Sequence, residues 1–134
     1  MGVVWGVACV ALGYLLGSIP VGYAIARWVR GIDIRQYGSG NVGATNVGRV
    51  LGHRWGLLVL GLDALKGAVP VALLPNLLLP PGTEGFQHWQ VAVGVATIVG
   101  HMYPAFLGLR GGKGVATALG VVSCLAPLAT LIAG

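Results

Sequence analysis

The sequence predicts an all-α fold, in which about four helices form a polytopic transmembrane bundle and a single integral-membrane domain over residues 1–134. Hydrophobic side chains make up 56% of the 134 residues, and the mean hydropathy is +0.86. Only 8 Lys or Arg and 3 Asp or Glu residues are charged, whereas about a quarter of the residues in a soluble domain are charged. The 24 glycines follow no G-X-Y period and are scattered among Leu, Val and Ala, which excludes collagen and disordered chains.

The first apolar run covers residues 2–26 and is predicted to be the first helix. No Lys or Arg precedes it and its positive charges follow it, the reverse of a cleavable signal peptide, so we expect it to remain in the protein. Pro20 should bend its second half, because proline cannot donate the helical hydrogen bond. Gly13 and Gly17 form a GxxxG pair, which is typical of closely packed transmembrane helices.

Three further apolar runs alternate with polar segments. We expect helices over residues 55–79, 90–109 and 115–134, and loops over residues 27–54, 80–89 and 110–114. Each run is close to the ~20 residues that cross a ~30 Å hydrocarbon core as a helix. Five arginines and one aspartate give loop 27–54 a net charge of +4, two cations give loop 110–114 a charge of +2, and loop 80–89 contains a single glutamate. The positive-inside rule therefore predicts that loops 27–54 and 110–114 are cytoplasmic, and that loop 80–89 and the N-terminus are external.

The expected loop 27–54 contains a stretch rich in hydrogen-bond donors, residues 37–46, which we call the first donor segment. It combines three glycines, two asparagines and the hydroxyls of a serine and a threonine, and an arginine follows it. Glycine lets the backbone approach an anion closely, and arginine can bind a phosphate through two parallel hydrogen bonds. The sequence therefore predicts an anion-binding site formed by Ser39, Asn41, Asn46 and Arg49.

The alternative for this region is an ordinary flexible loop whose arginines only obey the positive-inside rule. We prefer that explanation for Arg27, Arg30 and Arg54, which lie close to expected helix ends and can reach the lipid headgroups. Residues 38–43 also match the dinucleotide-binding pattern G-x-G-x-x-G, with Asp63 at the distance of its acidic partner. The context excludes a Rossmann site, because the preceding residues are too polar for a buried strand and Asp63 lies within an expected membrane helix.

A second donor segment, residues 109–117, leads into the last expected helix. A helix N-terminus behind a glycine turn offers free N–H groups and a favourable dipole to a phosphate, and Lys113 adds a positive charge. The segment is not a Walker A loop, because Leu107 occupies the position of its first glycine and Gly114 that of its Ser or Thr. A tight basic turn between two helices is the alternative, but it does not explain why so many donors converge beside the first donor segment.

Two ionisable residues lie within the second expected helix, Asp63 and Lys66. At a spacing of i, i+3 they share a helix face and can neutralise each other, so a structural ion pair is at least as well supported as a catalytic role. His101 could carry a proton, although a histidine beside a proline bend more often binds a freed carbonyl. The residues indicate no metal site, no cofactor and no Ser-His-Asp set.

Several motifs, in this order, closely resemble those of the bacterial PlsY-type glycerol-3-phosphate acyltransferases. They are Gly17-Ser18-Ile19-Pro20, the first donor segment with Arg49, Asp63-Ala64-Leu65-Lys66-Gly67, Gly100-His101, and residues 111–117 of the second donor segment. The resemblance implies a multi-pass protein of the bacterial inner membrane that transfers a fatty acyl group from acyl-phosphate to the sn-1 hydroxyl of glycerol 3-phosphate. The product is lysophosphatidic acid, and the reaction belongs to phospholipid biosynthesis.

The resemblance also assigns residue roles and partners. It implies that Ser39 and Arg49 are catalytic, and that Gly111, Gly112, Lys113 and Gly114 bind the substrate phosphate, to which the residues themselves add Gly40, Asn41 and Asn46. The expected partners are glycerol 3-phosphate, acyl-phosphate and membrane lipids, with no nucleic acid. The family has a seven-helix fold and a third motif containing histidine and asparagine or glutamate. That motif is absent here and the chain ends without a polar cap, so we expect an N-terminal fragment.

The chemistry implied by the resemblance needs no nucleophile from the protein, because an acyl phosphate is already an activated mixed anhydride. We expect Arg49 and Lys113 to bind phosphate, and backbone N–H groups of the glycine segments to stabilise the oxyanion. A phosphate oxygen of a substrate is expected to take the proton of the hydroxyl. The main alternative is a small anion channel or transporter fragment in which the charged side chains line a pathway.

Overall fold

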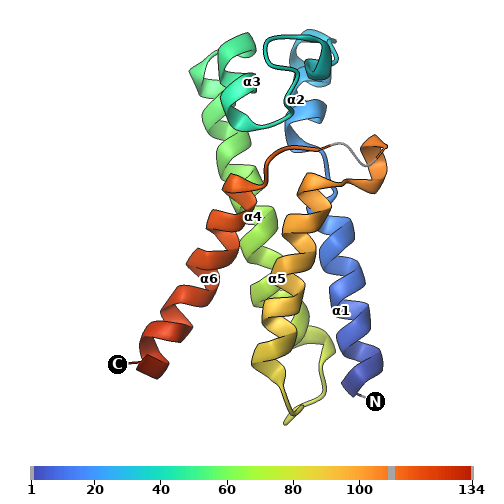
Figure 1. Ribbon diagram of the computed structural model, residues 1–134, viewed down its shortest axis with the longest axis vertical. Coiled ribbons are helices and arrows are strands. Elements are labelled where there is room, and N and C mark those ends of the chain that lie inside the picture. The colour runs from blue at the N-terminus through green and yellow to red at the C-terminus, as the bar shows by residue number, and fades with distance from the viewer. Residues whose placement is uncertain (1, 109–110, 134) are drawn as a thin grey trace.

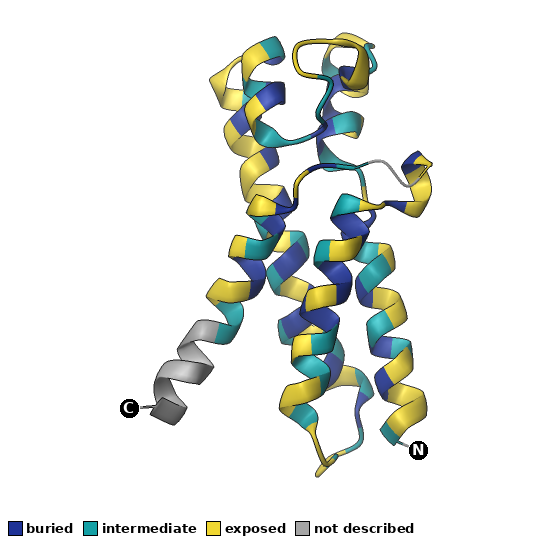
Figure 2. Cartoon of the chain, viewed as in Figure 1, coloured by how far each residue is buried: buried dark blue, intermediate teal, exposed yellow. Residues whose placement is uncertain are grey.

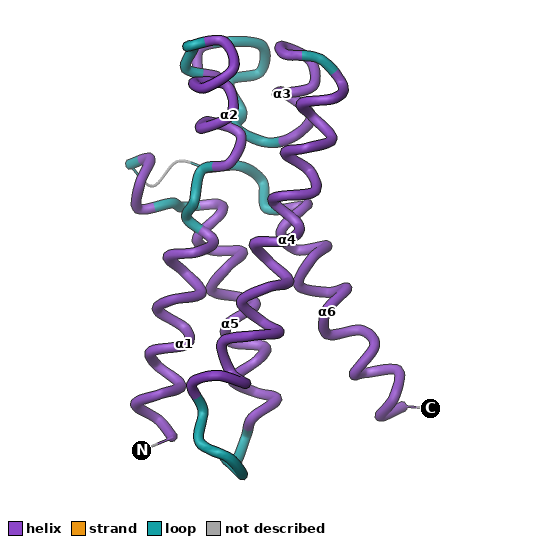
Figure 3. Tube along the Cα trace, turned by 180° about the vertical axis from the view of Figure 1, so that it is seen from behind, coloured by secondary structure: helices purple, strands orange, loops and turns teal. Residues whose placement is uncertain are grey.

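The fold is a bundle of helices, seen here in a computed structural model that describes the backbone of residues 2–108 and 111–133 (Figure 1). Side chains are described through residue 125, outside the gap at 109–110 that contains Arg110. In chain order the helices are α1 (Gly2–Gly17), α2 (Val21–Arg30), η1 (Ile34–Gln36), α3 (Ala44–Leu51), α4 (His53–Leu78), α5 (Phe86–Met102), η2 (Ala105–Leu107) and α6 (Val115–Ala133). The described ranges contain no strand (Figure 3), which confirms the predicted all-α fold.

Three described segments are long and apolar enough to span a membrane: Gly2–Arg30, His53–Leu78 and Phe86–Leu107. The portion of α6 with described side chains, Val115–Leu125, is also apolar but shorter. Figure 2 shows exposed residues along the outer faces of these helices, and many of them are large and apolar, such as Leu77. So much exposed apolar surface is unfavourable in water and suits contact with lipid chains.

The first span is two helices rather than the single bent helix expected over residues 2–26. Helix α1 ends at Gly17, and α2 begins at Val21 directly after Pro20. The proline ring removes a hydrogen bond and disfavours helical geometry in the residue before it, which turns the expected bend into a break. Within the break, the carbonyl of Ile19 accepts hydrogen bonds from the Val21 N–H at 3.0 Å and from Lys66 Nζ at 2.9 Å.

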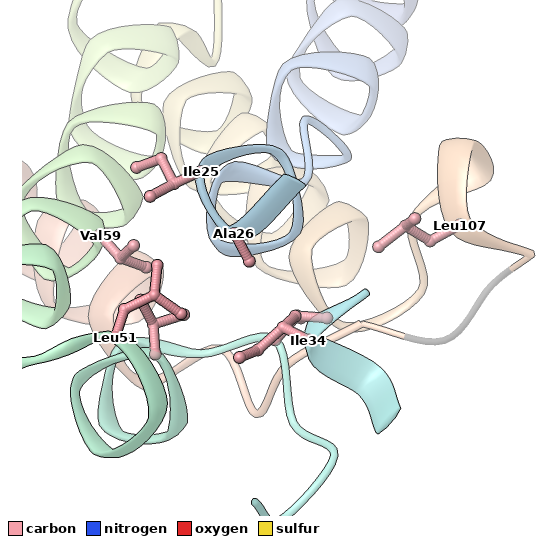
Figure 4. Packing of buried hydrophobic residues seen from close by; sticks show 8 residues of the cluster. Ile25, Ala26, Ile34, Leu51, Val59 and Leu107 are labelled. Carbon is pink, nitrogen blue, oxygen red and sulfur yellow. The ribbon is translucent and has the colours of Figure 1, made fainter. Parts of the chain in front are cut away.

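The region expected to be loop 27–54 is largely folded, so that prediction was wrong in its detail. It contains the end of α2, η1, all of α3 and the start of α4, and it packs with neighbouring residues around a small apolar core (Figure 4). The core includes Ile25, Ile34, Leu51 and Val59. An eight-residue amphipathic helix such as α3 is too short to produce a clear pattern in a sequence rich in glycine.

The other helix boundaries also differ from the expected ones. Helix α4 begins two residues earlier than predicted, and α5 begins at Phe86 and ends at Met102 instead of covering 90–109. Pro104 accounts for the early end, because the residue before a proline avoids helical geometry. The chain after it forms η2, and Gly111 and Gly112 of the second donor segment lie against the end of α5.

Glycines allow the spanning helices to pack at close range. Gly17 of α1 faces the backbone of Thr97 in α5, and Gly120 of α6 faces the carbonyl of Ala64 in α4, so that an added Cβ would overlap these atoms. Gly13 and Gly17 both face α5, as the GxxxG pattern indicated. These contacts join α1 to α5 and α4 to α6. Helices α2 and α3 lie at one end of the bundle, opposite the α4–α5 connection and the N-terminus (Figure 1).

Candidate active site

A cavity of about 480 Å³ lies where the two donor segments meet α4 and α5. The lining includes six residues that the sequence placed in the site: Ser39, Asn41, Asn46, Arg49, Lys113 and Gly114. These residues come from two segments more than sixty positions apart in the chain, and the fold brings them to one end of the bundle. Ser39, Arg49 and Lys113 are exposed, so a solute that enters the cavity can reach them.

Asn46 shapes the first donor segment from within. Its side chain is only 2% exposed, and Oδ1 accepts a hydrogen bond from the Ser39 N–H at 2.9 Å. Its Nδ2 donates to the carbonyls of Tyr37 at 3.0 Å and Asn41 at 2.9 Å. With both its donors and its acceptor engaged by the segment, the Asn46 amide holds the loop that presents Ser39, a role that its assignment to the phosphate did not anticipate.

The Ser39 hydroxyl and the Asn41 amide keep donors free at the cavity. Ser39 Oγ accepts the Asn41 N–H at 3.3 Å, and Asn41 Oδ1 accepts the Gly43 N–H at 2.7 Å. These bonds use acceptor capacity only, so the hydroxyl hydrogen of Ser39 and the Nδ2 donors of Asn41 can serve a ligand. Gly40 does not line the cavity. Its N–H donates to the Tyr37 carbonyl at 2.9 Å, and its φ of +78° forms the turn.

The second donor segment contributes through its later residues. The Gly111 N–H donates to the Met102 carbonyl at 2.9 Å and the Gly112 N–H donates to the His101 carbonyl at 3.2 Å, so both N–H groups cap the end of α5. Neither glycine lines the cavity. Val115 and Ala116, in the first turn of α6, do line it, although the sequence did not single them out. First-turn N–H groups have no acceptor within their helix, and the helix dipole there favours an anion.

Arg49 and Lys113 give the cavity two cations from separate elements. Neither forms an ion pair with any residue that the structure describes. Arg49 lies in the last turn of α3, and Lys113 lies two residues before the first residue of α6. Together with the first-turn N–H groups of α6 they make the cavity suited to a phosphate, which arginine can bind through two parallel hydrogen bonds.

Asp63 and Lys66 form the ion pair that their spacing indicated. Lys66 Nζ lies 3.1 Å from Asp63 Oδ1, and His101 Nδ1 lies 3.7 Å from the same oxygen. Asp63 is 1% exposed, and both Asp63 and His101 line the cavity. His101 thus faces a carboxylate, and its ring makes no described hydrogen bond to a freed carbonyl. The sequence carries no signal for this contact, because it joins α4 and α5.

A second ion pair lies outside the cavity, between Arg35 and Asp33. Arg35 Nη2 and Nε donate to the Asp33 carboxylate at 2.8 and 3.0 Å, and the guanidinium lies 5.0 Å from the centre of the Tyr23 ring. The hydrogen bond from Arg35 holds the pKa of Asp33 below its ordinary value. In the part of the chain that the structure describes, no three His, Cys, Asp or Glu side chains gather to hold a metal ion.

Comparison with known proteins identifies relatives of the chain. A family model described as "Glycerol-3-phosphate acyltransferase" matches residues 7–134. The glycerol-3-phosphate acyltransferase of Myxococcus xanthus (strain DK1622) is 56% identical over 126 residues, which cover 94% of this chain and 63% of the relative. That of Aquifex aeolicus (strain VF5) is 50% identical over 123 residues, which cover 91% of this chain and 60% of the relative.

Solved structures agree with these relatives. A crystal structure of PlsY, an integral membrane glycerol 3-phosphate acyltransferase, in its glycerol 3-phosphate form superposes with a TM-score of 0.77 at 44% identity, covering 95% of this chain and 60% of that one. The lysophosphatidic acid form gives a TM-score of 0.74 at 43% identity with the same coverage. The chain spans about three fifths of the length of these proteins. By its match over residues 7–134 and its close relatives, the chain belongs to the glycerol-3-phosphate acyltransferase family.

Proposed function

We propose that this chain forms the phosphate-binding part of an enzyme that transfers a fatty acyl group from acyl-phosphate to the sn-1 hydroxyl of glycerol 3-phosphate. The observation that carries the proposal is the cavity in which the two donor segments meet, with Ser39, Arg49 and Lys113 all at its surface. The family of the chain and the ligands named for the PlsY structures, glycerol 3-phosphate and lysophosphatidic acid, support it. They do not favour the anion channel that the sequence left open.

Arg49, Lys113 and the first-turn N–H groups of α6 bind phosphate in this proposal. Arg49 and Lys113 approach from α3 and from the turn before α6, so that a phosphate between them is neutralised from two directions. Val115 and Ala116 would donate their N–H groups along the helix axis. Gly111 and Gly112 act differently from the expectation of direct phosphate binding, since their N–H groups fasten the turn to α5.

The reaction itself is acyl transfer between two phosphorylated substrates. The sn-1 oxygen of glycerol 3-phosphate forms a bond to the acyl carbon, the bond from that carbon to the phosphate oxygen breaks, and inorganic phosphate leaves. The hydroxyl proton passes to a substrate phosphate oxygen. Protein donors stabilise the oxyanion that develops on the acyl carbonyl. The free hydroxyl hydrogen of Ser39 and the Nδ2 donors of Asn41, both at the cavity, would supply them. Orientation of two bound substrates then supplies much of the rate enhancement.

The membrane placement follows from the same arrangement. The cavity would open at the cytoplasmic face of the bacterial inner membrane, where the arginine-rich α2–α3 region lies, with the N-terminus and the α4–α5 connection external. The apolar helix faces would shelter the acyl chain, while its phosphate enters the cavity. The donor can then keep its chain in lipid and present only its activated head to the protein.

An acyl-transfer assay tests the proposal. Membranes containing the full-length gene product should convert acyl-phosphate and glycerol 3-phosphate to lysophosphatidic acid. Ser39→Ala and Arg49→Lys should each lower turnover by about 100-fold. Exposed Asn76, at the far end of α4, provides a control as Asn76→Ala, which should keep full turnover. Full turnover in both site variants would refute the residue roles, and anion flux into liposomes without acyl transfer would refute the proposed activity.

A further inference from the structure

Asp63 is a junction between three helices beneath the cavity. It lies about 15 Å along α4 from the first residue of that helix, and it is almost completely buried. Its carboxylate contacts His101 of α5, and its main-chain carbonyl accepts a hydrogen bond from Thr117 Oγ1 of α6 at 3.1 Å. The first turn of α6, which faces the cavity, is therefore docked on α4 at this residue.

His101 connects this junction to the second donor segment. Its Nδ1 faces Asp63 at 3.7 Å, and its Nε2 faces Gly112, where an added Cβ would lie only 2.5 Å from that nitrogen. The main-chain carbonyl of His101 accepts the Gly112 N–H at 3.2 Å. The backbone and the ring of one residue thus contact the glycine that directly precedes Lys113.

Lys66 balances the charge of the junction. Its ammonium lies 3.1 Å from Asp63 Oδ1 and donates to the Ile19 carbonyl, so it joins the break between α1 and α2 to α4. A buried ion pair costs desolvation that apolar side chains of similar size would avoid, which makes it weak as a device for stability alone. Here the pair adjoins the cavity, and Asp63 and His101 are part of its lining.

We propose that Asp63 and His101 are positioning residues, which hold Gly112 and thereby place Lys113 and the α6 N-terminus against the substrate phosphate. The inference rests on the proposed function, because it assumes that the cavity binds the phosphate of glycerol 3-phosphate. Without the His101 ring, the glycine turn can move into the space that the ring fills. A displacement of about 1 Å at Lys113 and the α6 N–H groups is enough to weaken a geometry-dependent interaction strongly.

The test uses the full-length gene product and measures the KM for glycerol 3-phosphate separately from kcat. His101→Leu and Asp63→Asn should raise the KM for glycerol 3-phosphate about tenfold or more, with a smaller change in kcat and in the KM for acyl-phosphate. His101→Asn keeps a polar amide beside the Asp63 carboxylate, so its KM should lie between those of the wild type and His101→Leu. Thr97→Val is the matched control, because Thr97 is buried one turn earlier in α5 and its hydroxyl bonds only within that helix.

A second arm tests the contact with Gly112 directly. Gly112→Ala places a methyl group against the His101 ring, and it should raise the KM for glycerol 3-phosphate. In a His101→Ala background the methyl group has space, so the same substitution should raise the KM much less. Equal effects of Gly112→Ala in both backgrounds, or a KM in His101→Leu that matches Thr97→Val, would overturn the proposal.

Thermal stabilisation by added glycerol 3-phosphate, measured on purified protein, distinguishes a failure of the proposed acyl transfer from a failure of the positioning role of Asp63 and His101. A wild type that is stabilised by the ligand but transfers no acyl group refutes the proposed activity, and the positioning role is then judged by whether His101→Leu loses the stabilisation. A wild type with neither response refutes both. If His101→Leu does not fold, His101→Asn and the Gly112→Ala pair decide the outcome.

Discussion

The Asn46 amide offers a test of how the first donor segment is held. Asn46→Ala removes three hydrogen bonds, from the Ser39 N–H and to the carbonyls of Tyr37 and Asn41. Each contributes about 1 kcal/mol net, and water can reach part of the segment once it opens, so we expect the closed loop to lose about 2 kcal/mol. That loss raises the population of the open loop by about 30-fold.

Amide hydrogen exchange measures this opening at groups that Asn46 does not itself contact. The Gly40 N–H is bonded to the Tyr37 carbonyl and the Gly43 N–H to Asn41 Oδ1, so both are protected only while the loop is closed. In Asn46→Ala both should exchange about 30-fold faster, and acyl transfer should fall as Ser39 loses its fixed position. Asn76→Ala should leave these rates unchanged. Wild-type exchange at Gly40 and Gly43 in Asn46→Ala would refute the reasoning.

Three further predictions concern packing and charge. Gly120→Ala places a methyl group against the Ala64 carbonyl and should lower the free energy of unfolding by about 1–3 kcal/mol in thermal or denaturant unfolding. Gly61 of α4 faces open space, so Gly61→Ala should not destabilise the protein. Equal losses in the two variants would contradict the close α4–α6 packing. Lys66→Met leaves the Asp63 carboxylate buried and unpaired and should lower the free energy of unfolding by about 3–5 kcal/mol. Combining it with Asp63→Asn should recover most of that loss. No recovery in the double variant would show that the unpaired carboxylate is not the cause of the loss. Arg35→Gln should return the pKa of Asp33 toward its ordinary value in an NMR titration. Because the pKa of Asp33 is lowered in the folded protein, the stabilisation by the Asp33–Arg35 pair is fully present above the ordinary pKa of an aspartate and is lost as the pH falls through the lowered pKa. An unchanged pKa of Asp33 in Arg35→Gln would exclude Arg35 as the cause of the shift.

The sequence predicted the bundle well because its signals are local. Apolar length and sparse charge identify spanning helices whatever their neighbours are, and Gly17 marked a close contact that the structure places on α5. The break at Pro20 was only half predicted. Whether a proline bends or ends a helix depends on which neighbouring groups bond the backbone around it, and here Lys66 of α4 donates to the Ile19 carbonyl beside Pro20.

The sequence was better at indicating which residues lie at the candidate site than at indicating what each of them does there. Ser39, Arg49 and Lys113 line one cavity, and the sequence indicated them because a stretch that combines glycines with a cation can be recognised from its composition. Asn46 and Gly112 have the right chemistry, but their groups are engaged by the protein itself, and only the folded geometry reveals this. His101 acquires its neighbours from α4 and from the turn before α6, contacts that no single stretch of sequence encodes.

A structure of the protein with glycerol 3-phosphate bound tests the central claim most directly. The account predicts that the phosphate lies in the cavity and contacts Arg49 from one donor segment and Lys113 with the first turn of α6 from the other. A phosphate bound outside the cavity, or held by only one of the two segments, would contradict it.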